Sequence, residues 1–243
     1  MSGVIPAGVT LKGYSAVREG QLTAARPASH TGSKLIHFVR HAEGHHNVAG
    51  QADFEEYKNE KYEDAELSEL GERQCEALKS ASADFIQGCL EGKRAELVVT
   101  SILRRCLQTS SLCFPQLKGK LPWVATELCR EQTGQHPCDR RRPLSETTAN
   151  SGFNHISFDE IKSETDPLYW NWNNGDREPL EACIERCEQF LDWLWDREEV
   201  EIIVCTHSAI LAHLIPLIER GGDTFQFFRN AEMRSYVVSK SGE

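Results

Sequence analysis

The most constraining feature of this chain is an alternation of short apolar runs with longer helical patterns. Residues 35–39, 96–100 and 200–206 are apolar and rich in β-branched side chains, which predicts buried strands. Helical apolar spacing follows the last two runs, over 102–113 and 208–219. Further segments continue the alternation, with helices expected over 69–90 and 178–197 and strands over 122–126 and 234–239. This order predicts an α/β fold, a three-layer sandwich in which helices flank a mostly parallel central sheet.

The length of the chain suits one domain. At 243 residues, of which 40% are hydrophobic, it can bury a sizeable core. No break in composition divides residues 34–243, so we expect a single domain there, with a loop-rich insert around 134–177. Residues 1–33 hold scattered Gly, Ala, Pro, Ser and Thr without periodicity, which predicts an irregular N-terminal extension.

The composition argues against several classes of partner. Lys plus Arg number 27 against 37 for Asp plus Glu, a formal net charge of -10, so no nucleic-acid partner is expected. No run approaches the ~20 apolar residues of a membrane span, and no secretory signal begins the chain. The nine cysteines are scattered, without a Cys-x-x-Cys pair, which predicts reduced packing residues. These features together predict a cytoplasmic protein without a membrane partner.

Basic side chains follow the ends of the three predicted strands. Arg40 and His41 follow the first, Arg104 and Arg105 the second, and His207 the third. In open α/β sheets, ligands bind outside the carboxyl ends of the strands. A neutral imidazole can attack phosphorus, while a guanidinium neutralises the phosphoryl oxygens. An Arg-His pair alone more often lies in an ordinary surface loop, but three such strand ends together predict a phosphate-handling site.

Four motifs at these junctions resemble the histidine phosphatase superfamily, which includes cofactor-dependent phosphoglycerate mutase and fructose-2,6-bisphosphatase. Val39-Arg40-His41 is similar to the family's Arg-His-Gly signature, with Ala42 in place of Gly. Residues 67–74 resemble its Leu-Thr-x-x-Gly-x-x-Gln helix opening, residues 100–109 its Ser-x-Leu-x-Arg-Ala-x-x-Thr block, and Thr206-His207 its second histidine. The likeness covers most of residues 35–212 and is nearest to eukaryotic phosphoglycerate-mutase-like proteins. It implies a phosphoglycerate mutase-like fold.

The resemblance also implies roles for individual residues. His41 would attack the substrate phosphorus and become a transient phosphohistidine, while Arg40, Arg105 and His207 surround the phosphoryl oxygens. Arg105, rather than Arg104, matches the family's pocket arginine. The N–H of Ser208, at the start of a predicted helix, would face the anion. The expected substrate-binding residues are Asn47, Gly44, Ser208, Arg140 and Arg141.

Two carboxylates are candidates for the proton donor that a leaving alkoxide needs. The family's acidic block reads Leu-x-Glu followed by a Gly four residues on. Here Glu131 precedes Gly134 by three residues and leads into a Gly-containing turn. We therefore expect Glu131 to be the donor, with Glu127 as its rival and a structural ion pair as the alternative for either carboxylate.

Parts of the chain around the site have more than one interpretation. The run Arg140-Arg141-Arg142 would bind a second anionic group of the substrate, or would pair with Asp139 and neighbouring acids to hold the loop. The aromatic, Asn-rich segment 166–175 would form a pocket wall or, the interpretation we favour, a packed surface loop. The charged segment 54–64 is expected to be solvated and to border the site.

Three functions remain open at this point. The first is a metal-independent phosphatase that hydrolyses phosphate monoesters through a phosphohistidine on His41. The second is a phosphoglycerate-mutase-type phosphotransferase with the same nucleophile, and the third is a non-catalytic protein that binds phosphorylated ligands. A metal site on His41, His45 and His46 lacks the His-Glu-x-x-His helix pattern, so neither a metal nor a cofactor is expected. The expected partner is a small phosphorylated substrate, whose identity the sequence does not indicate; nor does it indicate the oligomeric state.

Overall fold

The computed structural model describes residues 14–19, 32–172, 176–218 and 227–240. In this part of the chain one sheet has the strand order β1-β6-β2-β5-β3-β4. The neighbours β2, β5, β3 and β4 are parallel, whereas β6 is antiparallel to β1 and β2. The strand bounds are Tyr14–Glu19 for β1, Ser33–Arg40 for β2, Leu97–Ser101 for β3, Trp123–Thr126 for β4, Glu201–Thr206 for β5 and Met233–Lys240 for β6.

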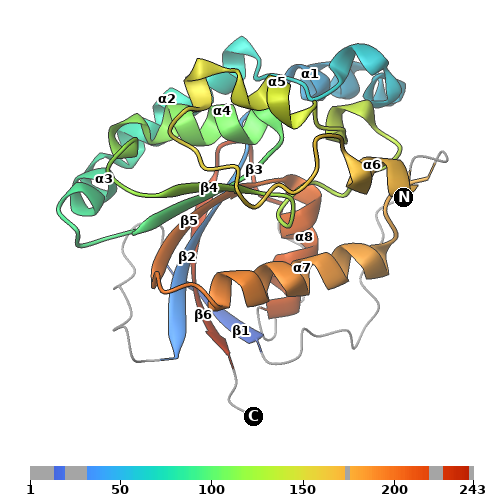
Figure 1. Ribbon diagram of the computed structural model, residues 1–243. Helices are drawn as coiled ribbons and strands as arrows, with labels where there is room; N and C mark the ends of the chain where they lie inside the picture. The colour runs from blue at the N-terminus through green and yellow to red at the C-terminus, as the bar shows by residue number, and fades with distance from the viewer. Residues whose placement is uncertain (1–13, 20–31, 173–175, 219–226, 241–243) are drawn as a thin grey trace.

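Helices cover both faces of this sheet (Figure 1). On one face lie α2 (Glu69–Ala81), α3 (Ala83–Leu90) and α4 (Arg104–Cys113), and on the other lie α7 (Leu180–Trp195) and α8 (Ser208–Ile218). Two hydrophobic clusters correspond to these two interfaces, because neighbouring residues of the buried strands point to opposite faces. In β2, for example, Phe38 belongs to one cluster and Val39 to the other. The predicted three-layer α/β sandwich is confirmed.

Most predicted elements agree with the structure to within two residues, but the helix expected over 69–90 does not. It is divided at Ser82, which ends α2 and begins α3. The backbone of Ser82, at φ -101° and ψ 10°, leaves the helical region, although its N–H still bonds the carbonyl of Leu78. The bend directs Phe85 and Ile86 into the core. Tertiary packing therefore overrides a periodicity that continues across the break.

The N-terminal segment is not irregular throughout. Residues 14–19, within the extension expected over 1–33, form β1 and pair with β6 from Tyr14↔Lys240 to Glu19↔Ser235. The physical reason lies in β6, which would otherwise present a row of unpaired backbone groups at the sheet edge. Residues 1–13 and 20–31 lie outside the described part of the chain.

The described residues of the loop-rich segment 134–177 also contain four short helices. They are η4 (Pro137–Asp139), α5 (Leu144–Thr148), η5 (Ser151–Phe153) and α6 (Pro167–Trp172). Buried Arg130 holds this segment with two bonds of 2.7 Å to the carboxylate of Asp166 and another to the carbonyl of Asp139. Bidentate guanidinium pairs of this kind are geometrically specific. The insert is thus held as a defined structure beside the carboxyl ends of the strands.

The remaining helices of the described chain are short. They are α1 (His45–Ala52), η1 (Phe54–Lys58), η2 (Glu60–Tyr62) and η3 (Pro115–Leu117). All nine cysteines are free and buried, as expected for packing residues. A search of the described helices finds none that combines the length and apolar character needed to cross a bilayer.

Candidate active site

The parallel register brings the two motif histidines together. Arg40 of β2 is paired with Thr206 of β5, so His41 and His207 follow neighbouring strands at the same edge of the sheet. Their ring centroids are 5.1 Å apart. Because β3 lies on the other side of β5, the start of α4 and its Arg105 reach the same edge. The three strand ends that the sequence singled out therefore converge.

His41 is oriented by its own loop. Its Nδ1 lies 2.7 Å from the carbonyl oxygen of Ala42, which requires the proton on Nδ1. The lone pair on Nε2 is then left facing Arg105, whose Nε lies 3.3 Å away. Burial, together with the charges of Arg105 and Arg40, holds the pKa of His41 well below its usual value of 6.5. His41 is therefore a neutral imidazole with its basic nitrogen directed toward a guanidinium.

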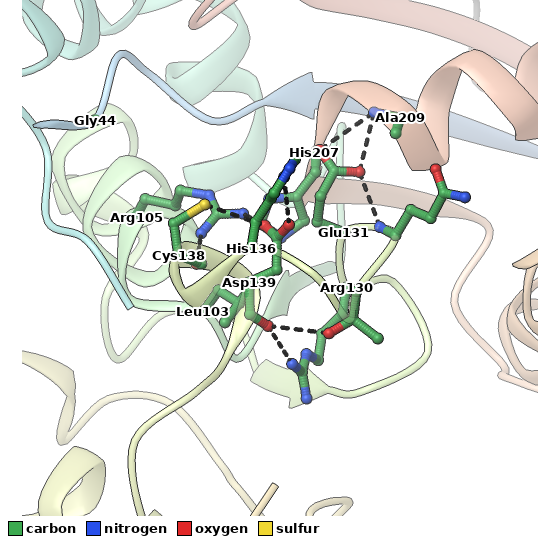
Figure 2. Close-up of polar contacts among 12 residues, drawn as sticks. Gly44, Leu103, Arg105, Arg130, Glu131, His136, Cys138, Asp139, His207 and Ala209 are labelled. Carbon is green, nitrogen blue, oxygen red and sulfur yellow. Dashed lines mark hydrogen bonds and ion pairs between the residues drawn. The ribbon is translucent and has the colours of Figure 1, made fainter. Parts of the chain in front are cut away.

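Asp139 fixes Arg105 from the insert side. Arg105 donates from Nη2 to Oδ1 of Asp139 at 2.9 Å and from Nη1 to the carbonyl of Cys138 at 2.5 Å. Figure 2 shows the guanidinium of Arg105 directed toward these two residues. Asp139 is buried and also lies 3.4 Å from the guanidinium of Arg177. One carboxylate thus aligns two arginines.

These groups line a cavity of about 670 Å³. Arg40 lies in its wall and bonds the carbonyl of Phe228 through Nη1, while its buried Nε has no partner. Five Arg, Asp and Glu side chains line the cavity in the described part of the chain: Arg40, Arg105, Arg177, Glu131 and Asp139. The remaining lining residues are neutral or histidine: His41, His46, Asn47, Phe54, Tyr57, Gln132, His136, Cys138, Leu180, Ser208, Ala209, Ala212, His213 and Phe227.

The structure separates the two candidate proton donors. Glu131 lies in the cavity wall, and its carboxylate accepts hydrogen bonds from the backbone N–H groups of Ala209 and Ile210 at the start of α8 (Figure 2). Glu127 does not line the cavity and instead pairs with Arg130 and Arg141. Of the two candidates, Glu131 is therefore the carboxylate that lines the cavity, whereas Glu127 is held in ion pairs outside it.

The residues expected to bind substrate are only partly brought together. Asn47 and Ser208 line the cavity. Gly44 does not line the cavity. Its backbone N–H donates to Oδ1 of Asn47 at the start of α1. A Cβ at Gly44 would also approach the ring of His46 to 2.6 Å. Gly44 is thus placed to form the turn rather than to contact a ligand.

Arg140 and Arg141 do not reach the cavity, so their expected role in substrate binding is corrected. Arg140 pairs with Glu60 and Glu63. Arg141 is buried, bonds Glu127 at 2.7 Å and donates to several backbone carbonyls between residues 142 and 165. Arg140 and Arg141 therefore hold the loop, which is one of the two roles considered for the arginine run. Their acidic partners are Glu60, Glu63 and Glu127, and Asp139 is not among them. The physical reason is that burial requires each guanidinium to satisfy its donors locally.

His207 lies behind His41 rather than in the cavity wall. Its Nε2 is 2.8 Å from Oγ of Ser101 and 3.4 Å from Sγ of Cys106. Burial and the charge of Arg105 hold its pKa well below 6.5. His207 is thus a buried neighbour of the His41 ring and is not among the residues that line the cavity.

Sequence reasoning missed several residues of the cavity. His46 lies in its wall, whereas the side chain of His45 is exposed, because neighbouring residues of α1 point in different directions. Asp139 and Arg177 come from the insert, and Phe54 and Tyr57 come from the charged segment expected to border the site. The spacing of residues in the sequence could not predict these positions, since the fold of the loops brings the residues to the site. Among the described residues of the aromatic segment 166–175, none lines the cavity, and Pro167–Trp172 form helix α6, in which Tyr169 is buried and Trp170 is 54% exposed.

The described residues contain no group of three or more His, Cys, Asp and Glu side chains arranged to hold a metal ion. His41 and His46 share the cavity with ring centroids 5.8 Å apart, but His45 faces a different cavity. The three histidines considered for a metal site are therefore not brought together.

Comparison with known proteins agrees with this arrangement. The sequence profile described as histidine phosphatase superfamily (branch 1) matches residues 36–240. The phosphoglycerate mutase-like protein 1 of Arabidopsis thaliana is 33% identical over 237 residues, which cover 84% of this chain and 81% of the relative. A second Arabidopsis thaliana phosphoglycerate mutase-like protein is 33% identical over 243 residues, 86% of each chain.

The fold also resembles solved structures. The alpha-ribazole phosphatase of Shigella flexneri superimposes with a TM-score of 0.53 at 19% identity, covering 83% of this chain and 89% of that one. At this identity the likeness concerns the fold alone.

Proposed function

Because this chain belongs to the histidine phosphatase superfamily, we propose that it is a metal-independent phosphatase that hydrolyses phosphate monoesters through a phosphohistidine on His41. The observation that carries the proposal is the orientation of His41. Its Nδ1 is bonded to the carbonyl of Ala42, which leaves Nε2 as the nucleophile beside Arg105 in a cavity. A weakly basic, unprotonated imidazole in this position is ready to attack phosphorus.

The proposed reaction has two steps. In the first, Nε2 of His41 forms a bond to phosphorus, the bond from phosphorus to the leaving oxygen breaks, and Glu131 gives that oxygen a proton. In the second, water attacks phosphorus and gives a proton back to Glu131, and the bond between phosphorus and nitrogen breaks. Arg40 and Arg105 bind the phosphoryl oxygens and stabilise the charge that develops on them. The products are an alcohol and inorganic phosphate.

The same groups would also serve a phosphotransferase, in which an alcohol replaces water in the second step. The names of the Arabidopsis relatives make this the main alternative. Assays for conversion of 3-phosphoglycerate to 2-phosphoglycerate, with and without added bisphosphoglycerate, separate the two activities. A phosphatase releases inorganic phosphate faster than it forms the isomer. A non-catalytic phospho-ligand-binding protein would do neither.

The first prediction tests the nucleophile. His41→Ala removes the attacking nitrogen, so we expect kcat for p-nitrophenyl phosphate to fall by about 10⁴-fold or more. The assay is run in chelator between pH 5 and 8, and rapid acid-free quenching of the wild type should trap an acid-labile phosphohistidine. His45→Ala, on the exposed neighbour, is the matched control and should keep full activity. Activity that survives in His41→Ala, or that disappears in chelator, contradicts the proposal.

A further inference from the structure

We propose that the outer part of the cavity is a binding site for a flat aromatic ring on an otherwise neutral leaving group, as in a nucleoside 5′-monophosphate. This inference rests on the proposed phosphatase function and deepens it by naming the substrate class. It is carried by three rings, Phe54, Tyr57 and His136, which we call the aromatic wall. None of the three has a role in the chemistry at His41.

The aromatic wall is a contiguous surface. The ring centroids of Phe54 and Tyr57 are 5.4 Å apart, those of Tyr57 and His136 are 5.4 Å apart, and those of Phe54 and His136 are 6.0 Å apart. Phe54 is 63% exposed, although large apolar side chains are costly to leave in water. An exposed phenyl ring in the wall of a polar cavity is well placed to stack on a planar group.

The wall is connected to the nucleophile by a line of rings. His46 lies between them, with its centroid 5.8 Å from that of His41 and 6.1 Å from that of Tyr57. Gly50 makes this possible, because a Cβ there would lie 2.0 Å from the ring of Tyr57. The ring of Tyr57 therefore rests directly against the backbone of α1. A substrate whose phosphate lies at His41 would extend its leaving group along this line.

The charge of the cavity favours one phosphate and a neutral remainder. In the proposed reactant state Glu131 carries the proton that it donates, so three arginines and Asp139 give the described lining residues a net charge of +2, which one phosphate dianion neutralises. Burial lowers the pKa values of His46, His136 and His213, so these rings stay neutral near pH 7. A second strong anion would find no uncompensated cation outside the phosphate site.

Neutral hydrogen-bonding groups nevertheless line the cavity as well. Both ring nitrogens of His213 are buried without a partner, and so is Nε2 of His136. Unsatisfied buried nitrogens cost free energy unless a ligand or water bonds them. Hydroxyl groups and the edge of a base would satisfy such nitrogens without adding charge.

The experiment compares two substrate pairs that share a leaving oxygen and differ only in the ring. Adenosine 5′-monophosphate is compared with ribose 5-phosphate, and benzyl phosphate with cyclohexylmethyl phosphate. We expect the wild type to prefer the ring-bearing member of each pair by about tenfold or more in kcat/KM, as base stacking typically provides. Phe54→Ala should bring each ratio close to one, and Phe54→Tyr should restore it. Leu112→Ala, an exposed residue of α4 outside the cavity, is the control expected to leave every rate unchanged.

Each outcome decides the proposal. Preference in both pairs supports a nucleoside 5′-monophosphate, and preference for benzyl phosphate alone supports the flat ring but rejects the nucleoside. A wild-type ratio near one in both pairs, or an equal loss of all four rates in Phe54→Ala, overturns the aromatic wall as a ring site. The affinities of adenosine 5′-monophosphate and ribose 5-phosphate for His41→Ala, measured by calorimetry, test ring binding without any turnover. Tighter binding of the nucleotide would support the wall even if the proposed hydrolysis failed, and equal binding would reject it.

Discussion

Asp139 is the residue on which the geometry of two cavity arginines depends. Its carboxylate lies 2.9 Å from Arg105 and 3.4 Å from Arg177, and its own carbonyl accepts from buried Arg130. Arg105 in turn contacts Nε2 of His41, the proposed nucleophile. Asp139 thus positions the guanidinium of Arg105, which we propose to bind phosphate, and supplies the negative charge that offsets the burial of this arginine. Figure 2 shows Asp139 and Arg105 beside each other.

The prediction at this scale concerns Asp139→Asn. Loss of the carboxylate leaves Arg105 and Arg177 without their counter-charge, and misalignment by about 1 Å is enough to lower kcat/KM by about 100-fold. Steady-state kinetics measure this effect. Inorganic phosphate should raise the melting temperature of Asp139→Asn more than that of the wild type, because an anion can replace the missing charge. Glu160→Gln, at an exposed position, is the control, and unchanged kinetics in Asp139→Asn would remove Asp139 from the site.

Among the secondary-structure elements, α2 supports the loop that carries the nucleophile. Gln74 accepts from the N–H of Glu43, and the N–H of Ser68 donates to the carbonyl of Glu43. Gly71 permits this approach, since a Cβ there would lie 2.1 Å from the oxygen of Glu43. The Gly in the Leu-x-x-x-Gly pattern of residues 67–71 is thus explained by a close contact between a helix and the loop that follows His41.

Gly71→Ala tests this contact. The added methyl must push α2 away from Glu43, so we expect a loss of about 1–3 kcal/mol in the free energy of unfolding, as for other overpacked sites. The displaced loop carries His41, and kcat should fall by about tenfold as well. Urea denaturation and the aryl phosphate assay measure the two effects. Arg73→Ala, on the exposed face of the same helix, should change neither, and a Gly71→Ala protein with wild-type stability would show that the contact is not needed.

For the whole molecule, the burial of histidine couples stability to pH. His41, His46 and His207 have pKa values held well below 6.5, chiefly by burial. Below pH 6.5 the unfolded chain therefore takes up protons that the folded protein does not, so protonation favours unfolding. Above pH 6.5 these imidazoles are neutral in both states and the penalty vanishes. Burial of these three neutral imidazoles therefore lowers the free energy of unfolding in mild acid.

We expect the free energy of unfolding to decrease as the pH falls from 7 to 5.5, with each of these histidines contributing up to about 1.4 kcal/mol per pH unit below 6.5. Urea denaturation at a series of pH values measures the slope. His41→Gln removes one of the groups and should make the slope shallower, whereas His45→Gln, on the exposed neighbour, should not. A stability independent of pH over this range would contradict the burial of neutral histidines.

The sequence by itself determined the three-layer fold and the convergence at its sheet edge. Apolar periodicity is a local property, and parallel strands necessarily end together, so Arg40, His41, Arg105 and His207 could be expected to meet. Only the tertiary structure decided that Glu131 faces the cavity while Glu127 does not, and that Asp139 rather than the arginine run serves the site. Those choices depend on how loops pack and on which buried charges find partners, which no local pattern records. For the same reason β1 and the aromatic wall became visible only when distant segments were brought together.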